Sequence, residues 1–210
     1  MTASEAVRAF DLERFIAEAR TEPLAGIVEG ETDATILTAA WGALFPGRPM
    51  PFSLHDGKGA KTMQSALNNH SLAALAGDRR VVAVFDLDGA YDQWNGVWPN
   101  ASDRASEDDA LGLLKRCHDG RFMALLLPVP AFRSGLAGQR FRGKSRLSIE
   151  LLFADADIPP EMIENEEQAG GGNVPVFRDT FKKRFAEHVK ALPTESFEAF
   201  RPLFAQFDNA

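Results

Sequence analysis

The feature that most constrains this fold is a run of five apolar residues at 81–85, which ends in Asp86 and, two positions later, Asp88. A strand that is apolar at every position must be covered on both faces, which is typical of parallel sheets flanked by helices. We therefore expect a strand over 79–86 inside an α/β sheet. The two carboxylates make the end of this strand a candidate functional site.

Further strand and helix patterns alternate along the first two thirds of the chain. Apolar runs predict strands over 24–29, 51–55 and 122–129, and helical spacing predicts helices over 6–19, 36–44, 60–76 and 107–117. Thr32 is the expected N-cap of the second helix. This alternation indicates a parallel sheet with right-handed crossovers.

The last third of the chain has a different character. Residues 148–153 are expected to start a helix, and the acidic, glycine-rich stretch 164–172 is expected to be an exposed loop. Phenylalanines between Phe181 and Phe204 then predict two amphipathic helices. We expect a helical segment over 1–23, a domain over 24–153, and a tail over 154–210 that packs on that domain.

Composition limits the class of protein. Hydrophobic residues make up 45% of the 210 and charged residues 25%, values typical of a folded globular chain. Apolar runs are too short to cross a bilayer, and acidic residues interrupt the N-terminal segment, so we expect a cytoplasmic protein. The single cysteine, Cys117, excludes internal disulfides and thiolate zinc sites. A net charge of −7 argues against binding polyanions over the whole surface, but allows a local basic patch.

Carboxylates follow two of the predicted strands. Glu29 ends the first strand, while Asp86 and Asp88 follow the strongest one. Parallel strands end at the same edge of the sheet, where ligands of such folds bind, so the three carboxylates are expected to converge. Their repulsion favours a divalent cation, and oxygen ligands suit Mg²⁺ or Mn²⁺. One or two ions are compatible with this set.

These residues resemble those of a known domain. Residues 27–33, Ile-Val-Glu-Gly-Glu-Thr-Asp, followed by Phe85-Asp86-Leu87-Asp88, resemble the TOPRIM domain of primases, topoisomerases, small RNA maturases and the overcoming-lysogenization-defect (OLD) nucleases. The pattern is most similar to the OLD group and spans about 24–153. The resemblance implies a Rossmann-like core with a mostly parallel four-stranded sheet between helices. The metal ligands that it implies are Glu29, Asp33, Asp86, Asp88 and Glu150.

The resemblance also implies an activity and partners. It predicts a metal-dependent nuclease that favours DNA over RNA, with Lys183 matching a transition-state lysine of the related nucleases. Those proteins carry an ATPase domain ahead of TOPRIM, which this chain lacks. Residues 57–62 are not a phosphate-binding loop, because His55 and Ala60 occupy the two glycine positions. Either a standalone nuclease or one subunit of a defence or repair complex with a separately encoded ATPase is expected; the oligomeric state is left open.

Basic residues are concentrated in a stretch without acidic residues. A loop that grips a phosphate backbone is expected here, and a solvated basic loop is the alternative. Its members are Arg133, Arg140, Arg142, Lys144 and Arg146. Trp94 and Trp98 either stack on bases or fix their own loop to the core. The four histidines share no ligand spacing and receive no role.

Structural explanations compete for several site residues. Asp33 in the first turn of a helix complements the helix dipole, and Glu150 and Lys183 suit solvated helix faces. Asp86 and Asp88 could form a plain turn.

Two other functions compete with a nuclease. Residues 84–89 also resemble the first motif of haloacid-dehalogenase-type phosphatases, with Asp86 as nucleophile and Asp88 as general acid. In that family Thr usually follows where Ala90 stands, and the motif usually ends the first strand, whereas two strand–helix units precede it here. A non-catalytic TOPRIM binding module is the third possibility, but it would not need three converging carboxylates.

Overall fold

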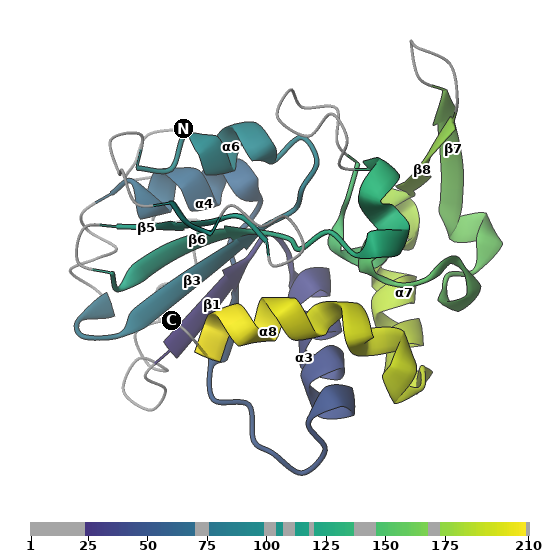
Figure 1. The fold of residues 1–210 in the computed structure, drawn as a ribbon, viewed down its shortest axis with the longest axis horizontal. Coiled ribbons are helices and arrows are strands. Elements are labelled where there is room, and N and C mark those ends of the chain that lie inside the picture. The colour runs from purple at the N-terminus through teal and green to yellow at the C-terminus, as the bar shows by residue number, and fades with distance from the viewer. Residues whose placement is uncertain are drawn as a thin grey trace.

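A six-stranded sheet forms the centre of the computed structural model (Figure 1). The structure describes residues 24–69, 76–98, 104–106, 112–117, 120–136, 146–167 and 173–208, so the predicted helix over 6–19 lies outside the described residues. The strands lie in the order β2 (Ser53–Asp56), β1 (Leu24–Val28), β3 (Arg80–Phe85), β6 (Phe122–Leu126), β5 (Leu114–Arg116) and β4 (Arg104–Ser106).

The pairing of these strands confirms the α/β fold class. β2, β1, β3 and β6 are parallel, and β5 and β4 extend the sheet antiparallel beyond β6. Every residue of β1 and β6 is buried, as expected of strands covered on both faces. The parallel part therefore has the four strands that were predicted, and the antiparallel edge was not predicted.

The predicted helix over 107–117 is wrong where the structure describes it. Residues 114–116 form β5, in which Leu114 pairs with Leu125 of β6. Lys115 sends its ammonium to the carbonyl oxygens of Trp94 and Asn95. These are tertiary contacts, which helical spacing in the sequence cannot report.

Helices cover both faces of the sheet (Figure 1). α3 (Glu31–Leu44) and α8 (Arg201–Asp208) lie on one face, and α4 (Ala60–Leu67) and α6 (Tyr91–Asn95) lie on the other. The predicted helix over 60–76 is interrupted after α4, because residues 68 and 69 are not helical. Trp41 of α3 meets Phe204 of α8 edge to face, with ring centroids 5.3 Å apart. None of the described helices is both long and apolar enough to cross a membrane.

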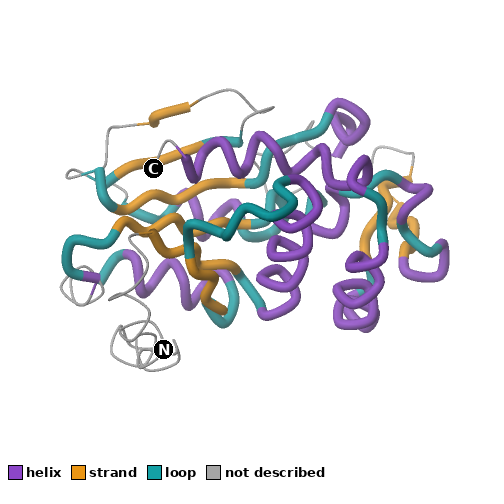
Figure 2. Tube along the Cα trace, turned by 90° about the horizontal axis from the view of Figure 1, so that it is seen from below, coloured by secondary structure: helices purple, strands orange, loops and turns teal. Residues whose placement is uncertain are grey.

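The C-terminal third forms short helices and a hairpin. Residues 148–153 give only the 3-10 turn η3 (Ile149–Leu152), and part of the predicted loop at 164–172 is wrong, because β7 (Ile163–Glu167) pairs with β8 (Asn173–Phe177). Figure 2 shows this hairpin at the far end of the molecule from the main sheet. The two predicted C-terminal helices appear as α7 (Lys182–His188) and α8. The remaining 3-10 turns are η1 (Ala131–Leu136), η4 (Asp155–Asp157), η5 (Pro160–Met162), η6 (Asp179–Phe181), η7 (Val189–Ala191) and η8 (Thr194–Phe200).

Close packing of α8 on β1 depends on a glycine. A Cβ atom at Gly26 would lie 2.7 Å from Leu54 Cδ2 and 3.1 Å from Phe207 Cε1, closer than side chains normally approach. At the exposed helical residue Gly42, a Cβ atom would meet nothing within 4 Å. The two glycines therefore provide a matched pair.

We expect Gly26→Ala to lower the free energy of unfolding by about 1–3 kcal/mol, because overpacking forces Leu54 and Phe207 apart. Gly42→Ala is expected to raise it by about 0.5–1 kcal/mol, since alanine is the better helix former. Urea denaturation of both variants measures the difference. Equal effects of the two changes would contradict the packing described for α8.

Candidate functional site

The candidate site lies where the order of the parallel strands reverses. From β1 the chain passes to β2 on one side, whereas from β3 it passes to β6 on the other. β1 and β3 are direct neighbours, and ligands of open α/β sheets bind outside the carboxyl ends of such a pair. Glu29 directly follows β1 and Asp86 directly follows β3, so the fold brings these two predicted residues to this position.

The backbone that carries Glu29 is fixed by the turn after β2. Gly57 N donates to Val28 O and Gly59 N donates to Glu29 O, both at 2.7 Å. A Cβ atom at Gly57 would lie only 2.8 Å from Val28 O, so only glycine allows this approach without a shift. Residues 57–59, part of the segment that was excluded as a phosphate-binding loop, thus fix the backbone of Glu29.

Asp86 connects three parts of the chain. Its backbone N–H donates to Glu29 Oε1 at 2.9 Å, and its own Oδ1 accepts from Ile149 N at 3.1 Å. Next to it, Leu87 and Leu147 exchange two backbone hydrogen bonds of 2.9 and 3.1 Å. These bonds bring η3, a segment distant in sequence, against the ends of β1 and β3.

Glu150 of η3 is the least solvated acid of the site. Its exposed fraction is 0%, and neither of its carboxylate oxygens has a hydrogen-bond partner. The nearest cation is the Lys182 ammonium, 3.8 Å from Glu150 Oε1. Its predicted alternative, a solvated helix face, is therefore wrong. A buried carboxylate without hydrogen bonds is costly unless a cation compensates its charge. A metal ligand is expected to be in the same state when no ion is bound.

Asp33 and Asp88 also serve their local backbone. Asp33 Oδ2 accepts from Gly30 N at 2.9 Å, and α3 begins after Gly30, so the predicted N-cap Thr32 is wrong. Asp88 Oδ1 accepts from Ala90 N at 2.8 Å, which fixes a turn. Both carboxylates retain further lone pairs for a cation.

Burial and mutual repulsion alter the pKa values of these acids. Burial raises the pKa of Glu29 to about 7, with help from Asp88 and Asp33 and against the hydrogen bond from Asp86 N. Burial and then Glu150 raise the pKa of Asp33 to about 6. The pKa of Asp86 lies well above its usual range because of burial and then Glu29. Glu29, Asp33 and Asp86 are thus buried acids whose charged forms are disfavoured further by neighbouring carboxylates.

The lysine at the site is Lys182, one residue before the predicted Lys183. Burial alone would lower the pKa of Lys182, but the charges of Glu150, Asp86 and Asp33 raise it above its usual value. Helical spacing contained this signal, because Lys182 lies three residues before the buried Phe185 and seven before the buried Val189 of η7.

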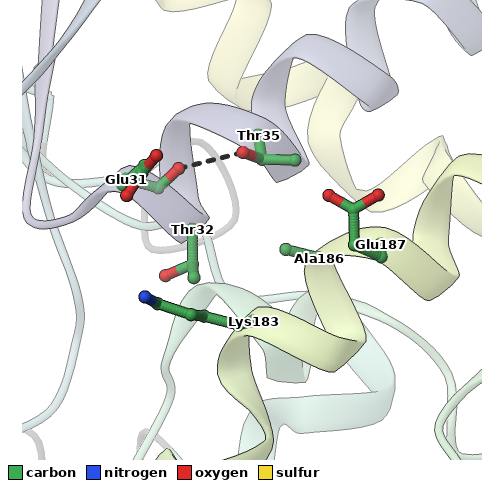
Figure 3. Close-up of a pocket in the computed structure, with 6 residues that line it drawn as sticks. All are labelled: Glu31, Thr32, Thr35, Lys183, Ala186 and Glu187. Atoms are coloured by element: carbon green, nitrogen blue, oxygen red, sulfur yellow. Dashed lines mark hydrogen bonds between the residues drawn. The ribbon is translucent and has the colours of Figure 1, made fainter.

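Lys183 is exposed and points toward Thr32 in a cleft between α3 and α7 (Figure 3). The cleft is lined by Glu31, Thr32, Thr35, Lys183, Ala186 and Glu187. It lies beside the start of α3, and no acid of the cluster lines it. The lysine beside the acids is therefore Lys182, and a catalytic role for Lys183 stays a prediction.

The predicted phosphate-binding residues fall into three groups. Arg140, Arg142 and Lys144 lie outside the described residues. Arg146 forms a two-pronged ion pair with Glu166 of β7, with distances of 2.8 and 3.1 Å. Arg133 is only 5% exposed, so the prediction that it grips a phosphate is corrected: its side chain is engaged inside the protein.

The two tryptophans take the structural role among the predicted alternatives. Trp94 is buried and its Nε1 donates to Ala124 O at 2.9 Å. Trp98 is half-buried and its Nε1 donates to Leu67 O at 3.0 Å. Both rings fasten the segment after β3 to the rest of the domain.

The donor set fits a hard divalent cation. In the described part of the chain, no three His, Cys, Asp or Glu side chains form a metal site as they stand. All the candidate donors are carboxylate oxygens, which a hard divalent cation prefers. Neither carboxylate oxygen of Glu150 accepts a hydrogen bond. The residue types are compatible with Mg²⁺ or Mn²⁺.

Comparisons with known proteins provide no further evidence about the site. Models of protein families, curated protein sequences and solved structures were compared with the chain, and none matches. The TOPRIM resemblance therefore depends on residues 27–33 and 85–88 and on the arrangement of the carboxylates.

The raised pKa values predict how stability changes with pH in the absence of metal. An acid with a raised pKa in the folded state stabilises the protein when protonated, and this stability is lost as pH rises from its ordinary pKa through the folded value. In EDTA, the Tm is expected to fall by several degrees between pH 5 and pH 8, because Glu29 and Asp33 titrate at about 7 and 6.

Thermal melts of the wild type and Asp86→Asn test this prediction. Removing one charge of the cluster should make the fall in Tm shallower, whereas the exposed control Glu195→Gln should leave it unchanged. A Tm that rises over the same pH range in EDTA would contradict the described burial of the cluster.

Proposed function

We propose that this protein is a Mg²⁺- or Mn²⁺-dependent phosphodiesterase that cleaves nucleic acid, DNA in preference to RNA. The observation that carries this proposal is the buried cluster of carboxylates at the reversal point between β1 and β3, with Lys182 beside it. Its members come from four separate segments of the chain. A set of this charge without a cation destabilises the fold, so its presence supports a catalytic purpose.

The residues that would hold the cation are Glu29, Asp33, Asp86, Asp88 and Glu150. When bound, one or two such ions supply activation of water and neutralisation of the leaving oxygen. The chain's own contribution is to present the oxygens from rigid positions. Glu29 is held by the turn after β2, and η3 is joined to Asp86 through Ile149 N.

Lys182 places a positive charge next to the carboxylates. Its side chain is 30% exposed, so the ammonium reaches both solvent and the buried Glu150. A phosphate group approaching the site would meet this ammonium, which stabilises negative charge that develops during cleavage. The proposed catalytic lysine is therefore Lys182.

The phosphatase and the non-catalytic module remain rival functions with distinct outcomes. A haloacid-dehalogenase-type enzyme would use Asp86 as a nucleophile and would hydrolyse small phosphate esters. Asp86 is 7% exposed and surrounded by other acids, which favours a ligand over an accessible nucleophile. A binding module would bind nucleic acid without cleaving it.

We expect metal-dependent cleavage of plasmid or linear DNA, with slower cleavage of RNA, and none in EDTA. Glu29→Gln, Asp86→Asn and Asp88→Asn should each lower the rate by roughly 100-fold or more, because loss of a ligand charge weakens the ion. Glu195→Gln is the matched surface control. Gel assays with Mg²⁺ or Mn²⁺, alongside a small phosphate ester, measure the rates.

Thermal melts provide a second readout for the same variants. In EDTA, Asp86→Asn should be as stable as the wild type or more stable, since repulsion is relieved. Mg²⁺ should raise the Tm of the wild type but not of the variant. Full cleavage by Asp86→Asn, or a metal-induced shift that survives in it, would place the site elsewhere. Cleavage only after addition of an ATPase would identify the chain as the nuclease subunit of a complex.

Lys182 and Lys183 form a matched pair of adjacent lysines. We expect Lys182→Met to lower kcat by roughly 100-fold, by analogy with loss of a single charge-stabilising donor, while the Mg²⁺-induced shift in Tm persists. Lys183→Met is expected to retain activity, because its ammonium lies in the separate cleft at α3. Single-turnover assays of both variants decide between them. The opposite ranking would restore the prediction from sequence.

A further inference from the structure

We propose that the ring of Phe132 is a platform on which an unpaired base of the substrate stacks, so that the preferred substrate is single-stranded nucleic acid. This proposal rests on the proposed nuclease function and names its substrate class. The ligand chemistry is the flat face of a nucleobase, which single-stranded DNA and RNA share.

Phe132 differs from every other large apolar side chain in the described part of the chain. It is 56% exposed, whereas the others are buried or half-buried. A single exposed apolar residue is common on protein surfaces, so exposure alone decides nothing. Two further features distinguish Phe132: its place in the fold and the contact of its ring with Arg133.

The position of Phe132 is at the same edge of the sheet as the carboxylates. β6 is parallel to β3, and the chain passes from the carboxyl end of β6 into η1, which contains Phe132 (Figure 1). Asp86 follows the neighbouring strand at this edge. The turn that carries Phe132 therefore follows the same edge of the sheet at which the carboxylates lie.

Arg133 connects η1 rigidly to the segment that carries Glu150. Its Nε donates to Leu151 O at 2.9 Å, its Nη2 donates to Phe153 O at 2.7 Å, and its Nη1 lies 2.7 Å from Asp155 Oδ1. Both carbonyl groups belong to residues that closely follow Glu150. The aromatic ring and the buried acid are thus held on one scaffold.

The same arginine supports the ring from beneath. The guanidinium carbon of Arg133 lies 5.2 Å from the centroid of the Phe132 ring. Because carbonyl groups and Asp155 fix this guanidinium, the ring rests on a rigid cation, and its exposed surface is available to a base. Such an arrangement loses little conformational entropy on binding.

Stacking on a side chain requires a base whose face is free. In a duplex the faces are covered by neighbouring base pairs, so the ring adds affinity only for unpaired bases.

Binding measurements in EDTA test the platform separately from cleavage. Probes are a fluorescently labelled single DNA strand, the same strand as RNA, its DNA duplex, and a DNA strand of abasic sites. We expect Phe132→Leu to weaken binding of the single strand by roughly 10-fold, and Phe132→Trp to preserve it, because only the latter keeps an aromatic face. Ser134→Ala, an exposed change in the same turn, is the control.

A stacking role moves two further readouts. A 2-aminopurine base in the single strand should be quenched by the wild type and by Phe132→Trp, but not by Phe132→Leu. Binding of the duplex and of the abasic strand should be unaffected by either change. The strand bound more tightly, DNA or RNA, identifies the sugar of the substrate.

Three results would overturn the platform: equal affinities of Phe132→Leu and the wild type for the single strand, an equal loss on the abasic strand, or preference of the wild type for the duplex. Failure of the nuclease function would instead appear as absence of metal-dependent cleavage in the assay described above. Because binding is measured without metal, the two failures are distinguishable.

Discussion

The repulsion among carboxylates packed at the ends of β1 and β3 is the constraint on which the rest of this structure depends. Burial disfavours the charged forms of Glu29 and Asp86, and neighbouring acids raise the pKa values of both further. Backbone N–H groups of Asp86, Gly30 and Ile149 offset part of this cost by donating to Glu29, Asp33 and Asp86. Two described cations interact with the remaining negative charge: Lys182 with Glu150, Asp86 and Asp33, and Arg146 with Asp88. The fold therefore holds the acids in place against their repulsion, and in the proposed function a divalent cation would offset the charge that is left.

The C-terminal third supplies two charged residues of the site, Glu150 and Lys182. Its aromatic side chains pack closely, with the Phe153 and Phe185 rings 5.2 Å apart and the Phe153 and Phe200 rings 5.1 Å apart. This cluster fixes η3 against α7, and thereby sets Glu150 opposite Lys182 at 3.8 Å. Buried aromatic area of this extent stabilises the segment strongly enough to tolerate a fully desolvated acid. The tail therefore belongs to the site, although the predicted domain boundary after residue 153 separates them.

The sequence predicted those parts of the fold that local patterns determine. The apolar run at 81–85 and the carboxylates after it identified β3, its neighbours and one edge of the sheet. What could not be predicted depends on pairing between strands, which the pattern within one strand does not report: β5 exists because it pairs with β6, and the hairpin at 163–177 because its two strands pair with each other. Arg133 was predicted to face solvent, because no residue close to it in sequence indicates that it donates to the carbonyl oxygens of Leu151 and Phe153. Lys182 was the exception, because helical spacing with Phe185 and Val189 could have identified it.

Arg133 illustrates how one side chain links the architecture to the proposed chemistry. Burying a guanidinium is expensive unless all its donors are used, and here they reach two carbonyl groups and Asp155. Those contacts fix the turn that carries Glu150 on one side, while Asp86 fixes it on the other through Ile149 N. The acid that no hydrogen bond satisfies thus lies on a turn that is fixed from two sides. Because the turn is held in this way, the carboxylate of Glu150 stays buried beside Lys182, and in the proposed function it is the oxygen donor that a divalent cation would need.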